Sequence, residues 1–237
     1  ALKVAFGDHL KSIYSKSADT LPERIQTKDE YLYGSCETPH SAIENGVNYK
    51  IDWITGQKTG FFIDQRDNRQ LLSLYSKGKT ILNTFCYSGG FSVLALQEGA
   101  TEVHSVDISQ KAIDVARDRI GKQADKVHWY CADITQATLP QGYFDVWHDR
   151  AVFHFLTEEA QRVKYVAQVM RSVKHGGYVI MSTFGPEGPE ECSGLGVVRY
   201  DTENLHRQFG KTFKLIKSST ELHQTPMGTT QQFLYCF

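Results

Sequence analysis

The spacing of apolar positions changes near residue 66 and divides the chain into two parts. Between Leu2 and Tyr14 apolar residues recur every three or four positions, which predicts an amphipathic helix over residues 1–17. Asn45-Gly46 then separates two β-like runs, and this pair predicts a hairpin because both residue types tolerate positive φ. A turn at Thr55-Gly56 would extend it to a small meander. We expect residues 1–65 to form a helix and β-hairpin appendage.

From residue 66 onward short apolar runs alternate with amphipathic stretches, which is typical of a parallel sheet with crossover helices. The two last runs are short and adjacent and predict an antiparallel pair at one edge. The expected fold class is therefore α/β: a Rossmann-like, seven-stranded, mostly parallel sheet with an antiparallel last strand over residues 66–237. The predicted strands are 80–86, 102–107, 127–131, 144–148, 177–183, 213–220 and 229–236, and the predicted helices are 66–76, 90–98, 109–121, 157–173 and 201–209.

Composition narrows the class of protein. With 41% hydrophobic and 22% charged residues among 237, the chain is typical of a globular protein. It has no apolar run near the roughly 20 residues of a membrane-spanning helix and no secretory signal pattern, so the expected location is the cytoplasm. It opens at Ala1 without a methionine, and we expect a fragment or a processed product.

Charge and cysteine content argue against two classes of site. The formal net charge of -1 provides no general attraction for nucleic acid, so a nucleic-acid partner is not expected. The five cysteines are scattered and form no CxxC pair, so neither a disulfide framework nor a metal site is indicated. Cys86 and Cys131 are interpreted as small buried apolar residues.

A cofactor site is predicted where the first strand of the sheet ends. That strand runs into Cys86-Tyr87-Ser88-Gly89-Gly90 and then a helix, so main-chain amides face the space above the sheet. Asp107 ends the next strand, at the spacing of an acid that accepts ribose hydroxyls, and Asp133 follows the third strand. Without these acids, the glycine pair would be equally consistent with a tight strand-to-helix turn. The bulky Phe85 and Tyr87 disfavour a dinucleotide pyrophosphate, and they favour S-adenosylmethionine (SAM), which has no phosphate.

The front of the chain resembles a known enzyme family. The segments Gly56-Gln-Lys-Thr-Gly-Phe-Phe-Ile-Asp-Gln-Arg66 and Asn83-Thr-Phe-Cys-Tyr-Ser-Gly-Gly-Phe-Ser92, with Glu44-Asn-Gly, are similar to bacterial 23S rRNA 5-methylcytosine methyltransferases of the RlmI type, over residues 30–115. The resemblance implies that Phe61, Asp64 and Arg66 lie beside the cofactor, although Asp64 alone could equally be a helix N-cap. The cofactor-binding candidates are Phe61, Asp64, Arg66, Phe85, Cys86, Tyr87, Ser88, Gly89, Asp107, Ile108, Asp133, Ile134 and His148.

The back of the chain, residues 115–237, resembles a different group, the methyltransferase type 12 proteins. The likeness rests on Phe144-Asp-Val-Trp-His-Asp-Arg-Ala-Val-Phe-His-Phe155, Cys192-Ser-Gly-Leu-Gly-Val-Val-Arg-Tyr200 and His223-Gln-Thr-Pro-Met-Gly228. The two likenesses meet in or near helix 109–121. One hypothesis is a chimera, natural or engineered, that joins the halves of two methyltransferases.

The two likenesses disagree about the methyl acceptor. Cytosine C5 methylation needs a cysteine thiolate that adds to the base, and the rRNA enzymes carry Asp-Pro-Pro after strand four and Ser-Cys-Ser at strand five. This chain has His148-Asp149-Arg150 and Ser182-Thr183-Phe184 at these places. The resemblance therefore implies SAM binding and does not extend to cytosine methylation.

Catalytic candidates lie at the end of the fourth strand. A histidine beside an acid is a plausible general base, which makes His148, Asp149 and Arg150 candidates, with His154 as a substrate contact. The alternative is structural: Asp149 caps a helix, Arg150 forms an ion pair and His154 packs. Arg199 and Tyr200 follow a Gly- and Pro-rich loop that could cover the substrate, and a surface ion pair is the alternative for Arg199. The family likeness implies that His223, Thr225 and Gln232 also lie near the opening of the substrate site.

Three functional readings follow. The first is a SAM-dependent methyltransferase acting on a small molecule or a protein side chain. The second is a SAM-binding protein without catalytic activity, and the third and least favoured is an rRNA cytosine methyltransferase.

Overall fold

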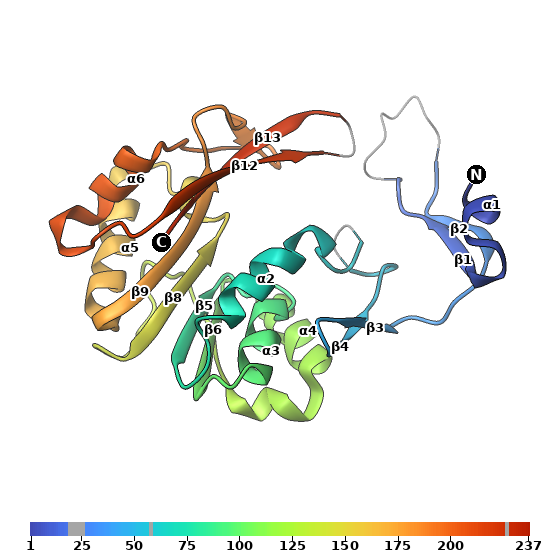
Figure 1. The fold of residues 1–237 in the computed structure, drawn as a ribbon, viewed down its shortest axis with the longest axis horizontal. Helices are drawn as coiled ribbons and strands as arrows, with labels where there is room; N and C mark the ends of the chain where they lie inside the picture. The colour runs from blue at the N-terminus through green and yellow to red at the C-terminus, as the bar shows by residue number, and fades with distance from the viewer. Residues whose placement is uncertain (19–26, 57–58, 226–227) are drawn as a thin grey trace. The chain divides into compact units, whose positions relative to one another are not determined.

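The computed structural model describes residues 1–18, 27–56, 59–225 and 228–237, shown as a ribbon in Figure 1. Four residues of the motifs quoted above, Gln57, Lys58, Pro226 and Met227, lie outside these ranges. The chain divides into two compact units, Ala1–Asn68 and Arg69–Phe237, and each is described by itself.

The first unit is mostly β-structure, and the helix predicted over residues 1–17 is wrong beyond its first turns. Helix α1 ends at Phe6, and strand β1 pairs antiparallel with β2. Gly7 has a φ of 51°, and Tyr14 packs edge-on against Tyr31 across the pair, with ring centroids 4.9 Å apart. The contact across the strands therefore outweighs the helical spacing. The elements are α1 (Leu2–Phe6), η1 (Gly7–His9), β1 (Ser12–Ser15), β2 (Glu30–Gly34), β3 (His40–Glu44), β4 (Val47–Ile51) and η2 (Ile63–Gln65).

The Asn-Gly hairpin is confirmed. Strands β3 and β4 pair antiparallel around Asn45 and Gly46, whose φ values of 50° and 77° are those that a tight two-residue turn requires. The meander is not formed, because residues 52–56 and 59–62 contain no further strand. The Asp52 carboxylate instead accepts hydrogen bonds from the amides of Ile54 and Thr55, at 2.9 and 3.0 Å, and turns the chain there.

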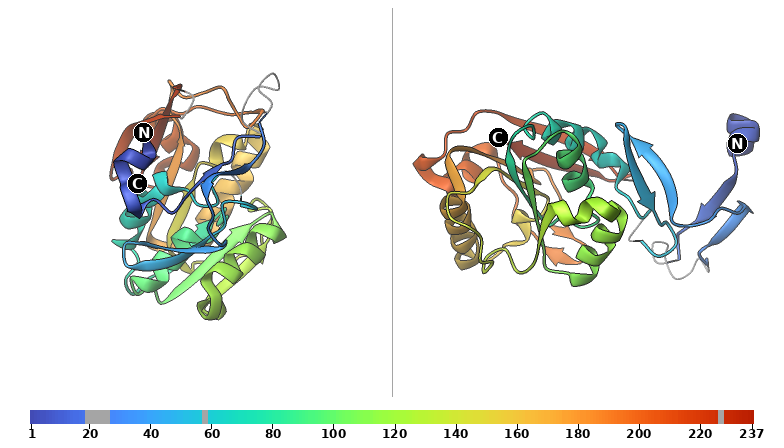
Figure 2. Two further views of the ribbon diagram at one scale, coloured as in Figure 1. Left: turned by 90° about the vertical axis from the view of Figure 1, so that its right-hand side faces the viewer. Right: turned by 90° about the horizontal axis from the view of Figure 1, so that it is seen from below.

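The second unit contains the predicted seven-stranded sheet (Figures 1 and 2). The strand order is β12-β13-β9-β8-β5-β6-β7, and only β13 runs antiparallel to its neighbours. Its strands are β5 (Thr80–Thr84), β6 (Glu102–Asp107), β7 (Val127–Cys131), β8 (Phe144–Arg150), β9 (Val173–Phe184), β12 (Ser218–Gln224) and β13 (Thr230–Cys236). A small hairpin, β10 (Glu191–Cys192) and β11 (Leu195–Gly196), lies outside this sheet. The predicted fold class is confirmed.

Strand β12 begins five residues later than the predicted 213–220. Phe213 packs against the core, and its carbonyl oxygen lies 2.7 Å from Nε2 of His206. The segment before the strand is thereby attached to helix α6. The helices are α2 (Arg66–Ser73), α3 (Gly90–Gln97), α4 (Gln110–Ile120), η3 (Gly121–Lys126), η4 (Phe153–Phe155), α5 (Glu159–Ser172), α6 (Thr202–Phe209) and η5 (Gly210–Thr212). Among the described helices, none is long and apolar enough to span a membrane.

Both faces of the sheet are covered, which explains why its central strands β5 and β8 are buried along most of their length. Leu82 and Trp147 belong to a buried cluster with side chains of α5 and α6. Ile81 and Val146 belong to a second cluster with side chains of α2 and α3. Successive residues of a strand point to opposite faces, so a strand covered on both faces buries side chains at successive positions.

Strand order fixes where a ligand can enter. The chain moves outward from β5 to β6 and β7, and then returns to β8 on the other side of β5. In open α/β sheets such a reversal opens a crevice outside the carboxyl ends of the strands. The site is therefore expected above the ends of β5 and β8.

Candidate functional site

The loop that leaves β5 has an unusual backbone. Phe85, Tyr87 and Gly89 have φ values of 57°, 45° and 76°. Non-glycine residues rarely adopt this region, and such strain concentrates at ligand sites. Gly89 is required for a second reason, since a Cβ there would lie 3.2 Å from Cβ of Ala116 and 3.3 Å from Cδ1 of Ile120. The loop is thus pressed against helix α4 while its main chain faces the crevice.

Asp107 connects this loop to the end of β6. Its carboxylate accepts hydrogen bonds from the amides of Tyr87, at 3.0 Å, and Ser109, at 2.9 Å. A carboxylate has about four acceptor positions, so capacity remains for the hydroxyls of a ligand. The next side chain, Ile108, is 71% exposed and offers an apolar surface beside the acid. The predicted loop and acid therefore come together.

The remaining cofactor candidates of this unit differ in accessibility. Asp133 is exposed, and its carboxylate accepts a hydrogen bond from the amide of Thr135 at 2.8 Å. The Ile134 side chain packs in the core, which leaves only its main chain for a ligand. Cys86 and Ser88 are buried, and burial raises the pKa of the Cys86 thiol well above its usual range. Cys131, expected to be buried, is exposed at the end of the edge strand β7.

His148 and Asp149 do not form the predicted His–acid pair. They are consecutive residues of β8, so their side chains point to opposite faces of the sheet. His148 contacts Asn83 and the ring of Phe91, whereas Asp149 contacts Tyr165 of helix α5. Asp149 therefore does not contact the His148 ring and cannot set its tautomer.

A different group sets the tautomer of His148. Asn83 donates through Nδ2 to the hydroxyl of Ser92 at 3.0 Å, so its Oδ1 accepts from Nδ1–H of His148, also at 3.0 Å. This arrangement leaves Nε2 as the basic nitrogen. Burial, and then the charge of Arg150, lowers the pKa of His148 to about 3. A base this weak is poorly suited to proton transfer at neutral pH, where the best pKa lies near the working pH.

Asp149 has a structural environment. It is fully buried and accepts a hydrogen bond from the Tyr165 hydroxyl at 2.5 Å, while that hydroxyl accepts from Nε1 of Trp147 at 2.9 Å. Burial raises the pKa of Asp149 to about 7, although the Tyr165 hydroxyl and the backbone amides of Val152 and Phe153 act in the opposite direction. Asp149 therefore ties β8 to the turn that follows it and to helix α5.

Three buried polar side chains near the carboxyl ends of β8 and β9 have no hydrogen-bond partner in the described structure. They are both ring nitrogens of His154 and the hydroxyls of Ser182 and Tyr200. His154 is 1% exposed and stacks on Phe184 with ring centroids 4.3 Å apart. Burial lowers the pKa of His154 to about 3 and raises that of Tyr200 to about 12. Buried polar groups are nearly always paired, so these three have unused capacity to bind a ligand.

The loop expected to cover the substrate is partly ordered as the β10–β11 hairpin. Arg199, at its end, contacts Glu190 at 3.0 Å and the carbonyl of Gly188 at 3.3 Å, so the alternative of a surface ion pair is observed. Gln232 of β13 holds the start of the loop, since its Oε1 accepts from the amide of Glu187 at 3.1 Å. Arg150 of β8 lies above the ring of Phe233, which belongs to β13 as Gln232 does, and its guanidinium carbon is 5.3 Å from the ring centroid.

Three cofactor candidates lie in the first unit. Phe61 is buried there against Tyr49, with ring centroids 4.8 Å apart. Asp64 accepts a hydrogen bond from the Gln65 side chain, and Arg66 contacts Asp67 at 3.4 Å. Their place beside the cofactor remains a prediction.

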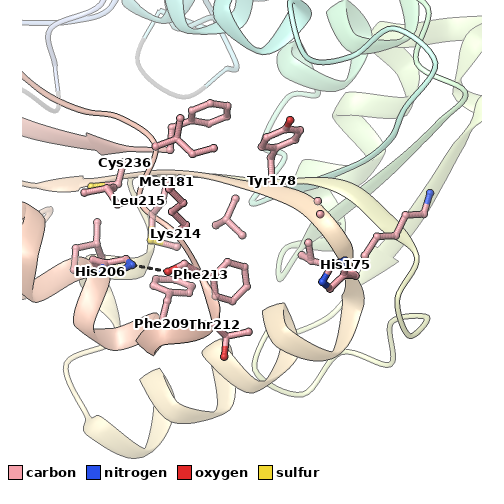
Figure 3. A pocket seen from close by; sticks show the side chains of 18 residues that line it. His175, Tyr178, Met181, His206, Phe209, Thr212, Phe213, Lys214, Leu215 and Cys236 are labelled. Carbon is pink, nitrogen blue, oxygen red and sulfur yellow. Dashed lines mark hydrogen bonds between the residues drawn. The ribbon is translucent and has the colours of Figure 1, made fainter.

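A pocket of about 430 Å³ lies elsewhere in the second unit (Figure 3). It is lined by the first half of β9, by helix α6 and by the segment that leads into β12, with Phe209, Phe213 and Met181 among its side chains. Because it opens beside the amino-terminal half of β9, it is distinct from the crevice at the carboxyl ends.

Two residues of the site were missed by the sequence analysis as functional candidates. Asn83 and Tyr165 each contact a predicted residue, but they lie 65 and 16 positions away from it. A polar Asn83 within a fully buried strand was the available signal, because a buried amide needs partners. Tyr165 gave no comparable signal.

Comparisons with known proteins agree with this geometry. Residues 81–177 match a family model described as a methyltransferase domain. A SAM-dependent methyltransferase from Mesorhizobium loti has a TM-score of 0.56 at 16% identity, covering 73% of this chain and 95% of that one. The N-methyltransferase NodS from Bradyrhizobium japonicum, in complex with S-adenosyl-L-homocysteine, has a TM-score of 0.57 at 16% identity, covering 73% and 84%. The second unit thus has the class I methyltransferase fold, and the cofactor of this class is SAM.

A narrower likeness concerns part of the chain. Ribosomal RNA large subunit methyltransferase I from Aeromonas hydrophila is 47% identical over 110 residues, which are 45% of this chain and 28% of that protein. The chain thus spans less than a third of the length of this relative. It carries a SAM-dependent methyltransferase domain with a region similar to the rRNA enzyme.

Proposed function

We propose that this chain transfers the methyl group of SAM to a small molecule or a protein side chain held outside the carboxyl ends of β8 and β9. The observation that carries the proposal is Asp107, which joins the strained loop after β5 to the end of β6 at the point where the strand order reverses. In this arrangement Asp107 accepts the ribose hydroxyls, and the exposed Ile108 packs against the adenine.

The acceptor would lie beside His154, Ser182 and Tyr200, whose polar atoms have no partner in the described structure. Methyl transfer forms a bond from the acceptor atom to the methyl carbon and breaks the bond to the sulfonium, releasing S-adenosylhomocysteine. Position contributes most to such a reaction. With its pKa near 3, His154 acts as a neutral hydrogen-bonding group that orients an N–H or O–H of the acceptor. The proton that the acceptor loses goes to water.

An rRNA acceptor is a second candidate because of the name of the relatives from Aeromonas hydrophila and Photobacterium profundum. The sequence disfavours this acceptor, and the residues of the site support the same order. Neither residues 148–150 nor residues 182–184 contain a cysteine, and Cys86 is buried with a raised thiol pKa. Addition of a thiolate to cytosine C6 therefore has no evident nucleophile in these two segments.

Two measurements test the proposal. Calorimetric titration of the full chain with SAM should show one binding event, and absence of binding by folded protein would refute every reading above. Release of S-adenosylhomocysteine is then measured with small amines, phenols and thiols, with peptides, and with a 23S rRNA fragment. Turnover on a small molecule or peptide supports the proposal. Turnover on rRNA alone favours the second candidate, and binding without turnover on any acceptor favours a catalytically inactive SAM-binding protein.

The chimera hypothesis is supported by the partial extent of the rRNA-enzyme likeness, 45% of the chain. The family match from residue 81 to 177 crosses the predicted junction in helix 109–121. Gly89 from the front part packs on Ala116 and Ile120 of that helix, so the join would have preserved a close contact. An uninterrupted reading frame for both parts in genomic DNA would exclude an engineered origin. The cytoplasm remains the expected location, which cell fractionation tests.

A further inference from the structure

Two histidines and a carboxylate meet at the amino-terminal end of the sheet. Glu102 begins β6, and His104 lies two positions later on the same face of that strand. His128 of the edge strand β7 is the register partner of His104, and the two imidazole rings stack with centroids 4.4 Å apart. One ligand atom from each of the three residues lies within 4.8 Å of the other two.

Contacts within this cluster are poor as hydrogen bonds. Nε2 of His104 lies 3.4 Å from one carboxylate oxygen of Glu102, and Nε2 of His128 lies 3.7 Å from the other. Good N–H···O bonds are about 2.7–3.2 Å long. The His104 contact is therefore a long hydrogen bond, and the His128 contact is longer than a hydrogen bond.

Tyrosines hold the outer atoms of the cluster. Nδ1 of His104 lies 3.0 Å from the Tyr130 hydroxyl, and the Tyr143 hydroxyl donates to Glu102 at 2.5 Å. In metal sites the ligating histidine usually makes a hydrogen bond through its other nitrogen, which fixes its tautomer and ring orientation. With Nδ1 bound to Tyr130, Nε2 of His104 is directed at the carboxylate as a ligand would be.

We propose that Glu102, His104 and His128 bind a transition-metal dication, with Zn²⁺ as the best match to two imidazoles and one carboxylate. Tetrahedral Zn²⁺ has Zn–N distances of about 2.0–2.1 Å, so its ligand atoms lie about 3.3 Å apart. The separations within the cluster, which reach up to 4.8 Å, must shorten for the ion to bind. His128 is 54% exposed and can make that adjustment. Water completes the coordination, and the ion ties edge strand β7 to β6.

The site is independent of the methyl-transfer proposal. Glu102 and Asp107 stand at opposite ends of the same strand, and the loop and acid of the cofactor site are at the carboxyl end. A metal at the amino end would act on the stability of the sheet edge and would leave SAM affinity unchanged.

Titration of the metal-free full chain with Co²⁺ and Zn²⁺ tests the proposal. We expect one equivalent to bind, with the visible Co²⁺ absorption typical of a four-coordinate site and with a melting temperature raised by roughly 5–10 °C at hundredfold saturation with Zn²⁺. His128→Ala and Glu102→Gln should each weaken binding at least tenfold. His175→Ala removes another exposed histidine and should bind as the wild type does.

Three results would overturn the proposal. They are no binding by folded protein, binding that His128→Ala leaves intact, and a Co²⁺ spectrum with a thiolate-to-metal charge-transfer band, which would locate the ion on cysteines. His128 is a partly exposed residue near the amino end of an edge strand, so its replacement should not unfold the chain. The circular dichroism spectrum and metal-free melting temperature of the variant check this.

Discussion

The two ends of strand β6 carry two carboxylates with different partners. At the carboxyl end Asp107 is held by backbone amides of Tyr87 and Ser109. At the amino end Glu102 is surrounded by the side chains of Tyr143, His104 and His128. Main-chain donors create a site for polar groups of an organic ligand, whereas imidazoles around an acid create one for a metal. The two proposals thus assign unlike chemistries to the two ends of one strand.

Strand direction explains this difference. In a parallel sheet the carboxyl ends of all strands lead into loops and helix amino termini, whose amides point away from the sheet. At the amino ends of β6 and β7 the pleat of the paired strands directs the side chains. Glu102, His104 and His128 belong to these ends. The predictions below separate the two ends.

Acid should destabilise the carboxyl end through its buried histidines. The pKa values of His148 and His154 are lowered to about 3, so from about pH 4.5 to 5.5 the unfolded chain binds nearly two more protons than the folded one at these positions. Asp149, with its pKa raised to about 7, binds nearly one more proton when folded. At these three positions the net difference of about one proton makes the free energy of unfolding rise by about 1.4 kcal/mol per pH unit across this window, and the lowered pKa of His104 adds to that rise.

Replacing one histidine sharpens that test. His154→Phe keeps a ring stacked on Phe184 and removes one titrating group, so the slope between about pH 4.5 and 5.5 should fall by about 1.4 kcal/mol per pH unit. It also removes two unpartnered buried nitrogens, so stability near pH 5 should increase. Urea unfolding midpoints at several pH values provide the measurement. Equal slopes for the variant and the wild type would contradict the assignment.

Removing the acid from each end should affect SAM binding at one end only. Asp107→Ala removes the proposed ribose acceptor, and loss of hydrogen bonds to a charged group, roughly 1.5–3 kcal/mol, predicts roughly 10–100-fold weaker binding. Glu102→Gln should bind SAM within about twofold of the wild type. Calorimetric titration measures both, with the exposed helix variant Asp118→Ala as a control. Normal binding by Asp107→Ala would remove the central support for the cofactor site.

Tyrosine hydroxyls provide a matched pair for stability. Tyr165→Phe leaves the buried Asp149 without its side-chain donor and Nε1 of Trp147 without its acceptor, which should cost about 1–3 kcal/mol. Tyr143→Phe, in metal-free protein, removes an exposed hydroxyl at the amino end and should cost clearly less than Tyr165→Phe. Denaturant unfolding measures the loss of unfolding free energy for both variants. A larger loss for Tyr143→Phe than for Tyr165→Phe would contradict the expected order.

The smallest effect on the free energy of unfolding is expected at Arg199, which follows the β10–β11 hairpin. Arg199→Ala removes the exposed pair with Glu190, and such pairs are worth about 0–1 kcal/mol. The unfolding midpoint should therefore change little. A loss above about 2 kcal/mol would mean that the hairpin is part of the folded core.

Patterns of neighbouring residues in the sequence predicted most of the helices and strands. The alternation of apolar runs was sufficient for the α/β fold class, and Asn45-Gly46 was sufficient for the β3–β4 hairpin because those residue types tolerate positive φ. Asp107 was found because an acid at a strand end has a fixed relation to the preceding loop. The helix over residues 1–17 failed because pairing with β2 outweighed its spacing.

Contacts between distant segments could not be predicted in this way. The sequence alone determined the fold class, the loop after β5 and the acid that meets it, since periodicity and chain direction bring these together in any sheet of this kind. Tertiary structure decided that His148 contacts Asn83 while Asp149 contacts Tyr165, and that Glu102 meets two histidines. The reason is physical: the pleat sends adjacent side chains to opposite faces, and only strand register and helix packing select their partners there.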